Sequence, residues 1–151
     1  MKLGLEQHPQ SVDLKLLQVE IYIFENELDK AFSLLGKLER IEPSNDEIFI
    51  QKATINSKTG KHKEAIINLE KALTFTDDKV DVWSLIGMEY LYLDNFEKAR
   101  LSFEKCIEVD FEDYSALYNI VYCYDMEQKH AQAIVYLDNY ININPYCEVA
   151  W

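Results

Sequence analysis

The side chains that could bind a metal ion or act as nucleophiles are few, and they are scattered along the chain of 151 residues. They are His8, His62, His130, Cys106, Cys123 and Cys147. Zinc sites usually take their histidine and cysteine ligands in closely spaced pairs, and a dithiol motif needs a Cys-x2-Cys spacing. Neither pattern occurs in this sequence. We therefore expect no metal site and no cofactor, and we expect the histidines to lie in solvent-exposed turns.

A cluster of carboxylates at Asp110, Glu112 and Asp113 is the remaining candidate for cation chemistry. It lacks the ligand spacing and the central glycine of a calcium-binding loop. It also comes directly before a predicted helix, where carboxylates stabilise the positive end of the helix dipole. We interpret this cluster as a helix start and not as a calcium site.

No sequence motif for catalysis is present. The four glycines are isolated from one another, so they form no phosphate-binding loop, and there is no nucleophile elbow or His-Glu-x2-His motif. We interpret Cys106 as a reduced, buried thiol that packs as a small apolar residue. The sequence thus predicts a protein that is not an enzyme and has no catalytic residues.

The element that must position all of these residues is a repeat of 34 residues. Alanine recurs at this interval, at Ala31, Ala65, Ala99 and Ala133. All three prolines, Pro9, Pro43 and Pro145, lie on the same grid. A fixed period of this length indicates one helix–turn–helix unit copied in tandem. The four complete repeats are residues 12–45, 46–79, 80–113 and 114–147.

The third repeat shows the pattern most clearly, with Trp83, Ile86, Gly87, Tyr90, Ala99, Phe103 and Cys106. This resembles the tetratricopeptide repeat family, whose pattern is Trp-x2-Leu-Gly-x2-Tyr followed by Ala, a large apolar residue, Ala and Pro. The departures from the pattern are Lys15, Gln18, Lys52, Asn56, Asp77 and Phe111. The resemblance implies an all-α fold, a right-handed α-solenoid of tandem antiparallel helix pairs.

Apolar residues at helical spacing support the same fold without the family name. First helices are predicted over 12–25, 46–58, 80–92 and 114–126, and second helices over 28–41, 62–75, 96–109 and 130–143. A small residue such as Gly87 at the middle of a first helix lets its partner helix pack closely. Ser44 followed by Glu47 predicts a capping box at the start of the second repeat.

The repeat grid also runs up to both ends of the sequence. Residues 1–11 resemble the end of a preceding repeat, and residues 148–151 resemble the start of a further one, with Trp151 on the tryptophan position. An array normally closes with a polar capping helix. We therefore expect the chain to be a fragment of a longer repeat protein.

The charge of the chain excludes several classes of partner. There are 27 acidic against 15 basic residues, for a net charge of −12. This argues against binding to nucleic acids and to anionic membrane surfaces, because a protein binds either of them through basic patches. A basic partner would be attracted most to the third repeat, which has nine acidic and three basic residues. An acidic surface kept for solubility is the alternative. Reduced cysteines fit a cytoplasmic protein.

The family resemblance implies that the first helices line a concave face that binds a peptide or a partner surface. Carried onto this chain, it gives Glu20, Phe24, Ile50, Thr54, Asp81, Ser84, Met88, Tyr92, Tyr118, Tyr122 and Asp125 as candidate binding residues. Leu16 and Ile23 hold groove positions as well. Independently of the family, Tyr114, Tyr118 and Tyr122 share one helix face, either as core or as a ligand-binding stripe. Asp81 and Asp125 are candidates to pair with a Lys or Arg of the partner.

The sequence therefore predicts a non-enzymatic protein–protein interaction scaffold whose partner is a protein or peptide of basic or apolar character. A clamp for acidic C-terminal tails is disfavoured, because Leu16, Glu20 and Asp81 stand where such clamps carry Lys or Asn. Two alternatives remain. The array could self-associate as a structural assembly, for example as a homodimer through its open ends. It could also be the regulatory or docking segment of an enzyme whose catalytic domain lies outside this chain.

Overall fold

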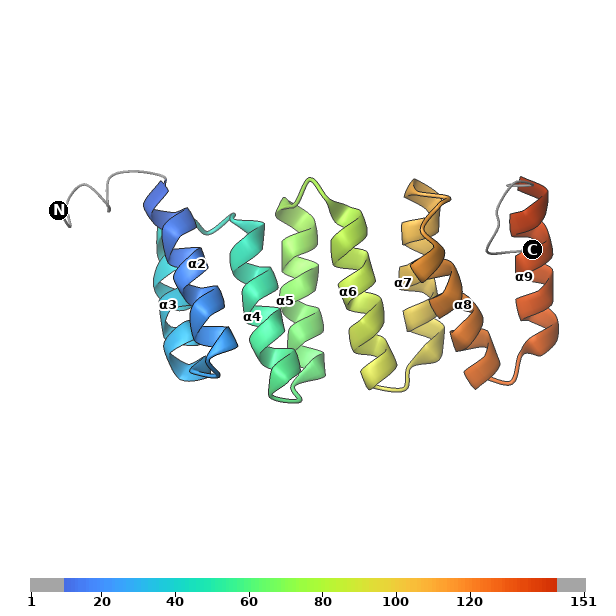
Figure 1. Ribbon diagram of the computed structural model, residues 1–151, viewed down its shortest axis with the longest axis horizontal. Coiled ribbons are helices and arrows are strands. Elements are labelled where there is room, and N and C mark those ends of the chain that lie inside the picture. The colour runs from blue at the N-terminus through green and yellow to red at the C-terminus, as the bar shows by residue number, and fades with distance from the viewer. Residues whose placement is uncertain (1–9, 144–151) are drawn as a thin grey trace. The chain divides into compact units, whose positions relative to one another are not determined.

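The computed structural model describes residues 10–143, and helices joined by short turns account for all of them (Figure 1). The helices are α2 (Gln10–Phe24), α3 (Leu28–Ile41), α4 (Asp46–Lys58), α5 (His62–Phe75), α6 (Lys79–Tyr92), α7 (Phe96–Val109), α8 (Tyr114–Met126) and α9 (His130–Ile143). The predicted all-α class of tandem helix pairs is confirmed. Within this part of the chain, none of the helices is both long enough and apolar enough to cross a membrane.

The predicted helix boundaries agree closely with the observed ones. The second helices begin and end where the repeat pattern predicts, and α2 begins two residues earlier than expected. The turn inside each helix pair explains this regularity. It contains a residue of positive φ in all four repeats, at Asn26 (62°), Gly60 (77°), Asp94 (56°) and Gln128 (57°). A left-handed residue ends the first helix at a fixed place, so the second helix begins in register.

Asn and Asp side chains cap the starts of α4, α6, α7 and α8, and one of these caps differs from the prediction. Asn45, not Ser44, caps α4, because its Oδ1 accepts a hydrogen bond of 3.0 Å from the Glu47 backbone N–H. The predicted Ser44–Glu47 capping box is therefore wrong. Asp113 caps α8 by accepting a 3.0 Å bond from the Ala116 N–H, which confirms the interpretation of its carboxylate as a helix start.

The chain divides into two compact units, residues 1–77 and 78–151. In the first unit, α2 contacts α3 and α4, and α4 contacts both α3 and α5. Its core cluster combines residues of three helices, Val12, Leu16, Val19, Ile23, Ala31, Leu35, Leu38, Ile48 and Ile55. Burying these apolar side chains is what holds the helix pairs together, since short helices are marginal alone.

The second unit is built around Phe103, which is fully buried between α6, α7 and α8. A Cβ atom added at Gly87 would lie 2.6 Å from the Phe103 ring, so only glycine fits there. The prediction that a small residue permits close packing at Gly87 is confirmed. Cys106 and Cys123 complete this core as free, buried thiols. Burial raises the pKa of both thiols to about 11, so they stay protonated at neutral pH.

Several expectations concern residues 1–9 and 144–151. They include the partial repeats at the two ends, Pro9, Pro145 and Trp151, and the side chains of His8 and Cys147. All of these lie outside the described residues.

Candidate partner-binding surface

The first part of the candidate surface is one side of α6. Asp81, Ser84, Met88 and Tyr92 follow one another at intervals of three or four residues, which places them on one helix face. The opposite face, with Val82 and Ile86, is buried. Met88 and Tyr92 are 38% and 61% exposed, and Ser84 is half-buried. This side of α6 therefore presents apolar and aromatic atoms that the core does not use.

The second part is the matching side of α8, in the same unit. Tyr118 and Tyr122 are 66% and 47% exposed, while Leu117 and Ile120 are buried on the other side of the helix. The Tyr122 ring lies edge-on to the ring of Phe96, with centroids 6.3 Å apart and an interplanar angle of 74°. This contact orients Tyr122, because edge-to-face geometry is favoured between aromatic rings.

The tyrosine stripe predicted on α8 divides between core and surface. Tyr114 is half-buried and packs against the core cluster of the second unit, whereas Tyr118 and Tyr122 are exposed. Both interpretations of the stripe therefore describe part of it. The two exposed rings remain candidates for ligand contact, and Tyr114 supports the fold.

The two candidate carboxylates on α6 and α8, Asp81 and Asp125, differ in their interactions within the fold. Asp78 caps α6, and its negative charge raises the pKa of the exposed Asp81, with smaller effects from their hydrogen bonding, from burial and from Asp113. Three carboxylates thus make the start of α6 electronegative. At the other end of α8, Asp125 Oδ1 already lies 3.1 Å from His130 Nδ1 of α9. Asp81 is therefore more available than Asp125 to pair with a basic residue of a partner.

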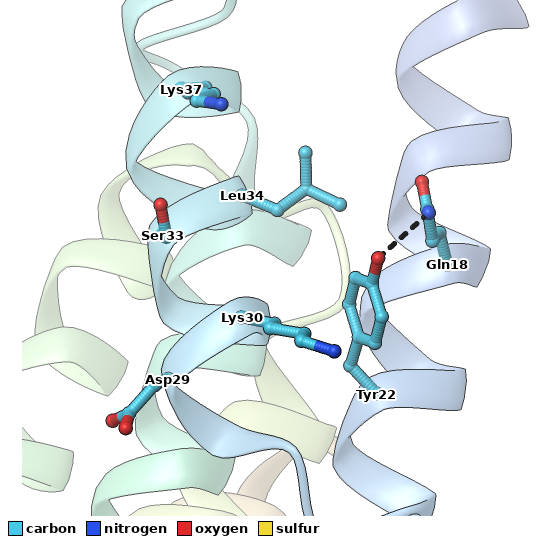
Figure 2. A pocket seen from close by; sticks show the side chains of 7 residues that line it. All are labelled: Gln18, Tyr22, Asp29, Lys30, Ser33, Leu34 and Lys37. Carbon is cyan, nitrogen blue, oxygen red and sulfur yellow. Dashed lines mark hydrogen bonds between the residues drawn. The ribbon is translucent and has the colours of Figure 1, made fainter.

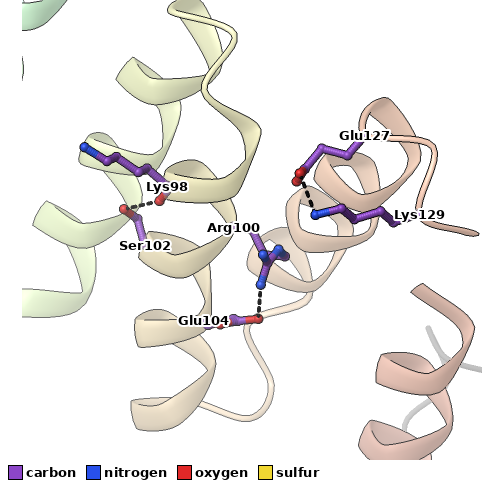
Figure 3. A network of polar contacts seen from close by, with 6 residues as sticks. All are labelled: Lys98, Arg100, Ser102, Glu104, Glu127 and Lys129. Carbon is purple, nitrogen blue, oxygen red and sulfur yellow. Dashed lines mark hydrogen bonds and ion pairs between the residues drawn. The ribbon is translucent and has the colours of Figure 1, made fainter. Parts of the chain in front are cut away.

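Polar contacts within α7 and within the turn after α8 surround Arg100, which also contacts α8 (Figure 3). The Arg100 guanidinium lies 4.7 Å from the centroid of the Tyr124 ring, and its Nη1 is 3.4 Å from Glu104 Oε1. Lys129 pairs with Glu127 at 2.9 Å in the turn between α8 and α9. Because Arg100 is largely buried, its stacking on Tyr124 joins consecutive repeats.

The remaining predicted residues lie in the first unit and form a more polar surface. Gln51 Nε2 donates to Glu20 Oε1 at 3.3 Å and to Glu47 Oε1 at 2.9 Å, linking α2 to α4. The Thr54 hydroxyl donates to the Ile50 carbonyl at 3.0 Å. Glu20 and Thr54 are thus engaged within the fold. Phe24, at the end of α2, is 91% exposed.

Two wider groove positions from the sequence are wrong. Leu16 and Ile23 do not line a surface, because both are buried in the core of the first unit. The reason is that α2 is apolar around most of its circumference, so its packed side could not be chosen from composition. The side of α2 that is exposed instead carries Leu14, Leu17 and Ile21. Comparing equivalent positions in successive repeats would have found these three residues.

The eleven predicted site residues thus fall into two groups, one in each unit. Those on α6 and α8 combine exposed aromatic and apolar side chains with carboxylates. Throughout residues 10–143, no three His, Cys, Asp or Glu side chains come close enough together to hold a metal ion.

Known structures share this fold. The crystal structure of MamA protein is 19% identical, with a TM-score of 0.74 over 89% of this chain and 73% of that chain. MamA from Desulfovibrio magneticus is 14% identical, with a TM-score of 0.72 over 91% of this chain and 77% of that one. A tetratricopeptide repeat protein from Parabacteroides merdae is 17% identical, with a TM-score of 0.74 over 95% of this chain and 56% of that one.

Sequence comparison gives the family directly. No curated protein matches the chain. One family model described as tetratricopeptide repeat matches residues 46–78 and 80–113, and a second with the same description matches residues 115–145. These matches cover more than half of the sequence, and the structure has the fold that they require. The chain belongs to the tetratricopeptide repeat family.

Proposed function

We propose that this chain is a non-enzymatic scaffold that binds a basic, apolar peptide or partner surface on the exposed sides of α6 and α8. Tetratricopeptide repeats generally mediate protein–protein interactions. The proposal of this particular surface rests on four exposed side chains that are not part of the core cluster of the second unit. They are Met88, Tyr92, Tyr118 and Tyr122.

The residue types favour recognition of a peptide. Tyrosine offers a large contact area at a low cost in side-chain entropy, and methionine adapts its shape to different apolar groups. Aromatic residues are also enriched among those that contribute most to binding free energy. Tyr122 is already oriented by Phe96, so it loses less conformational freedom when a ligand binds.

The charge of the second unit favours a basic ligand. Residues 78–143 contain 13 acidic and five basic side chains. The negative potential attracts Lys and Arg and speeds their association. Asp81 is the carboxylate best placed to accept such a residue, because neighbouring carboxylates already repel its own charge. The free thiols of Cys106 and Cys123 fit a reducing environment, and we propose the cytoplasm as the compartment.

The test compares defined peptides on defined variants. A fluorescent amphipathic peptide of Lys and Leu would be titrated with the wild-type chain, with a Tyr118→Ala/Tyr122→Ala variant and with a Leu101→Ala/Val109→Ala control. The control removes exposed apolar atoms from α7. We expect the tyrosine variant to bind at least about tenfold more weakly and the control to bind like wild type.

Circular dichroism would establish that each variant is folded. A version of the peptide with Glu in place of Lys should bind weakly to all three chains, because it is repelled by the acidic unit. Undiminished binding of the Lys–Leu peptide by a folded tyrosine variant would exclude this surface as its site.

A further inference from the structure

A second surface, separate from α6 and α8, lies on the outer side of α2. Leu14, Leu17 and Ile21 follow one another at helical spacing and are 55%, 54% and 56% exposed. They form a stripe, called here the α2 stripe, beside the stripe that α2 buries in its own core. One large exposed apolar residue needs no explanation, but three in register on one helix indicate an interaction surface.

The repeat register shows what such positions do elsewhere in the chain. Thirty-four residues after the α2 stripe come Ile48, Gln51 and Ile55, and all three are buried. Ile48 and Ile55 belong to the same core cluster as residues of α3, the preceding second helix. In the fourth repeat, the equivalents Ala116 and Cys123 are likewise buried in a cluster with residues of α7. The middle position is less constant, because Leu85 of the third repeat is 41% exposed and Asn119 of the fourth is half-buried. The first and third positions are therefore where the second and fourth repeats receive the second helix of the repeat before.

The third and fourth repeats show how such a helix is received. Arg100 of α7 stacks on Tyr124 of α8 at 4.7 Å. Burial is the main cause of the raised pKa of Tyr136 on α9, and the charge of Glu104, one turn later on α7, adds to it through electrostatics. The second helix of the third repeat thus lays Arg100 over the ring of Tyr124 in the fourth repeat. The side chain one turn later, Glu104, faces the region of Tyr136.

The same receiving positions are open in the first repeat (Figure 2). Tyr22 and Leu34 stand where the fourth repeat has Tyr124 and Tyr136. They border a hollow of about 380 Å³ between α2 and α3, whose charged lining residues are Lys30, Lys37 and Asp29. Figure 2 shows Leu34 and Lys30 of α3 pointing towards Tyr22 of α2. Lys30 pairs with Glu27 at 2.5 Å, so Lys37 is the more available of the two cations.

A helix with the complementary residues exists in this chain, and it is α9. Ile134 stands where the third repeat has Arg100, and Asp138 stands where it has Glu104. Ile134 is 59% exposed, and Asp138 is exposed on the same side of α9. In the register of α7 on α8, Ile134 would cover Tyr22, and the Asp138 carboxylate would lie beside Leu34 and the two lysines. Ile134 would thus meet an aromatic ring, and Asp138 would enter a hollow in which two lysines outnumber the one carboxylate, Asp29.

We propose that copies of this chain associate head to tail, with α9 of one copy docked on the α2 stripe and the α2–α3 hollow of the next. The contact between two molecules would have the same geometry as the contact between α7 and α8 within one molecule. Such contacts are heterologous, because two different surfaces meet. The proposal does not depend on peptide binding at α6 and α8.

Sedimentation velocity over a dilution series tests the association. We expect the average mass of the wild-type chain to rise above that of a monomer with concentration. A Leu17→Glu/Ile21→Glu variant should raise the apparent Kd at least about 100-fold, because it places two charges in the apolar contact. A Leu101→Glu variant, at an exposed site on α7, is the control and should associate like wild type. All substituted positions are exposed, and circular dichroism would verify that the variants fold.

A charge exchange tests the register. Lys37→Glu and Asp138→Lys should each weaken association, because each places like charges together. An equimolar mixture of the two variants should recover it, because the carboxylate introduced at position 37 of one copy then faces the ammonium group introduced at position 138 of the other. Three outcomes would each overturn the proposal: a wild-type chain that is monomeric at every concentration, a folded Leu17→Glu/Ile21→Glu variant that associates as before, or a mixture that shows no recovery.

Discussion

At the scale of single residues, the tightest constraint in the second unit is the contact of Gly87 with Phe103. Gly87→Ala would place a methyl group 2.6 Å from the fully buried ring of Phe103, so the ring would have to shift within the core. We expect a loss of about 1–3 kcal/mol in the free energy of unfolding, measured by urea denaturation.

The other repeats suggest how that loss can be reversed. The first repeat pairs Val19 with Leu35 and the second pairs Ala53 with Leu69, at the same spacing as Gly87 and Phe103. Gly87→Ala/Phe103→Leu should therefore be more stable than the sum of the two single changes predicts. If the losses in unfolding free energy of the two single variants simply added up in the double variant, the two side chains would not be coupled through packing.

A second residue-scale prediction concerns the left-handed turn residues. Gln128 has φ 57°, a conformation that costs a side chain with a Cβ atom roughly 1–2 kcal/mol. Gln128→Gly should stabilise the chain by about 1 kcal/mol, and Gly60→Ala, at the equivalent turn, should destabilise it by a similar amount. Thermal and urea unfolding would measure both. Equal effects of the same sign would contradict this account of the turns.

The buried thiols make a prediction about pH. Burial raises the pKa of Cys106 and Cys123 from 9.0 to about 11. Between these values the unfolded chain loses the thiol protons while the folded chain retains them, so the free energy of unfolding falls as the pH rises. We expect Cys106→Ala/Cys123→Ala to reduce this slope between pH 9 and 11 relative to wild type. An unchanged slope would mean that other groups cause it.

At the scale of elements, α9 depends on a hydrogen bond to the turn before α8. The Tyr140 hydroxyl donates to the backbone carbonyl of Phe111. The other repeats have Leu38, Ala72 and Cys106 at this position. Cys106 Sγ makes a longer contact of 3.5 Å with the Val80 carbonyl, whereas Tyr140 donates from a hydroxyl group. Tyr140→Phe keeps the ring and should cost about 0.5–1.5 kcal/mol. Hydrogen exchange should report the loss mainly in α9, and equal loss of protection in α6 would contradict a local role.

The elements were also the part of the fold that could best be predicted. The period of 34 residues places each turn, and the left-handed residue at Asn26, Asp94 and Gln128 then sets where each second helix begins. The site was less predictable, because it depends on which side of a helix is packed. On α8 the buried Leu117 and Ile120 leave Tyr118 and Tyr122 outside, as the spacing suggests. On α2 most of the circumference is apolar, and tertiary contacts decide that Leu16 is inside and Leu17 outside.

At the scale of the whole molecule, the two proposed surfaces respond to salt in opposite directions. The chain carries a net charge of −12, so copies of it repel one another over distances comparable to the Debye length, about 10 Å at 0.1 M salt. Added salt screens that repulsion, while the apolar contacts of the α2 stripe with α9 are little affected. Head-to-tail association should therefore strengthen as salt is added.

Binding of a basic peptide should weaken over the same range, because salt screens its attraction to the acidic second unit. Sedimentation of the chain alone and fluorescence anisotropy of the Lys–Leu peptide, measured in the same series of buffers, compare the two responses directly. If both weakened together, the Lys37–Asp138 attraction would outweigh the net repulsion, and the charge-exchange variants would then show a larger effect than Leu17→Glu/Ile21→Glu. If the peptide were insensitive to salt, its binding would rest on Tyr118 and Tyr122 alone, without a contribution from Asp81.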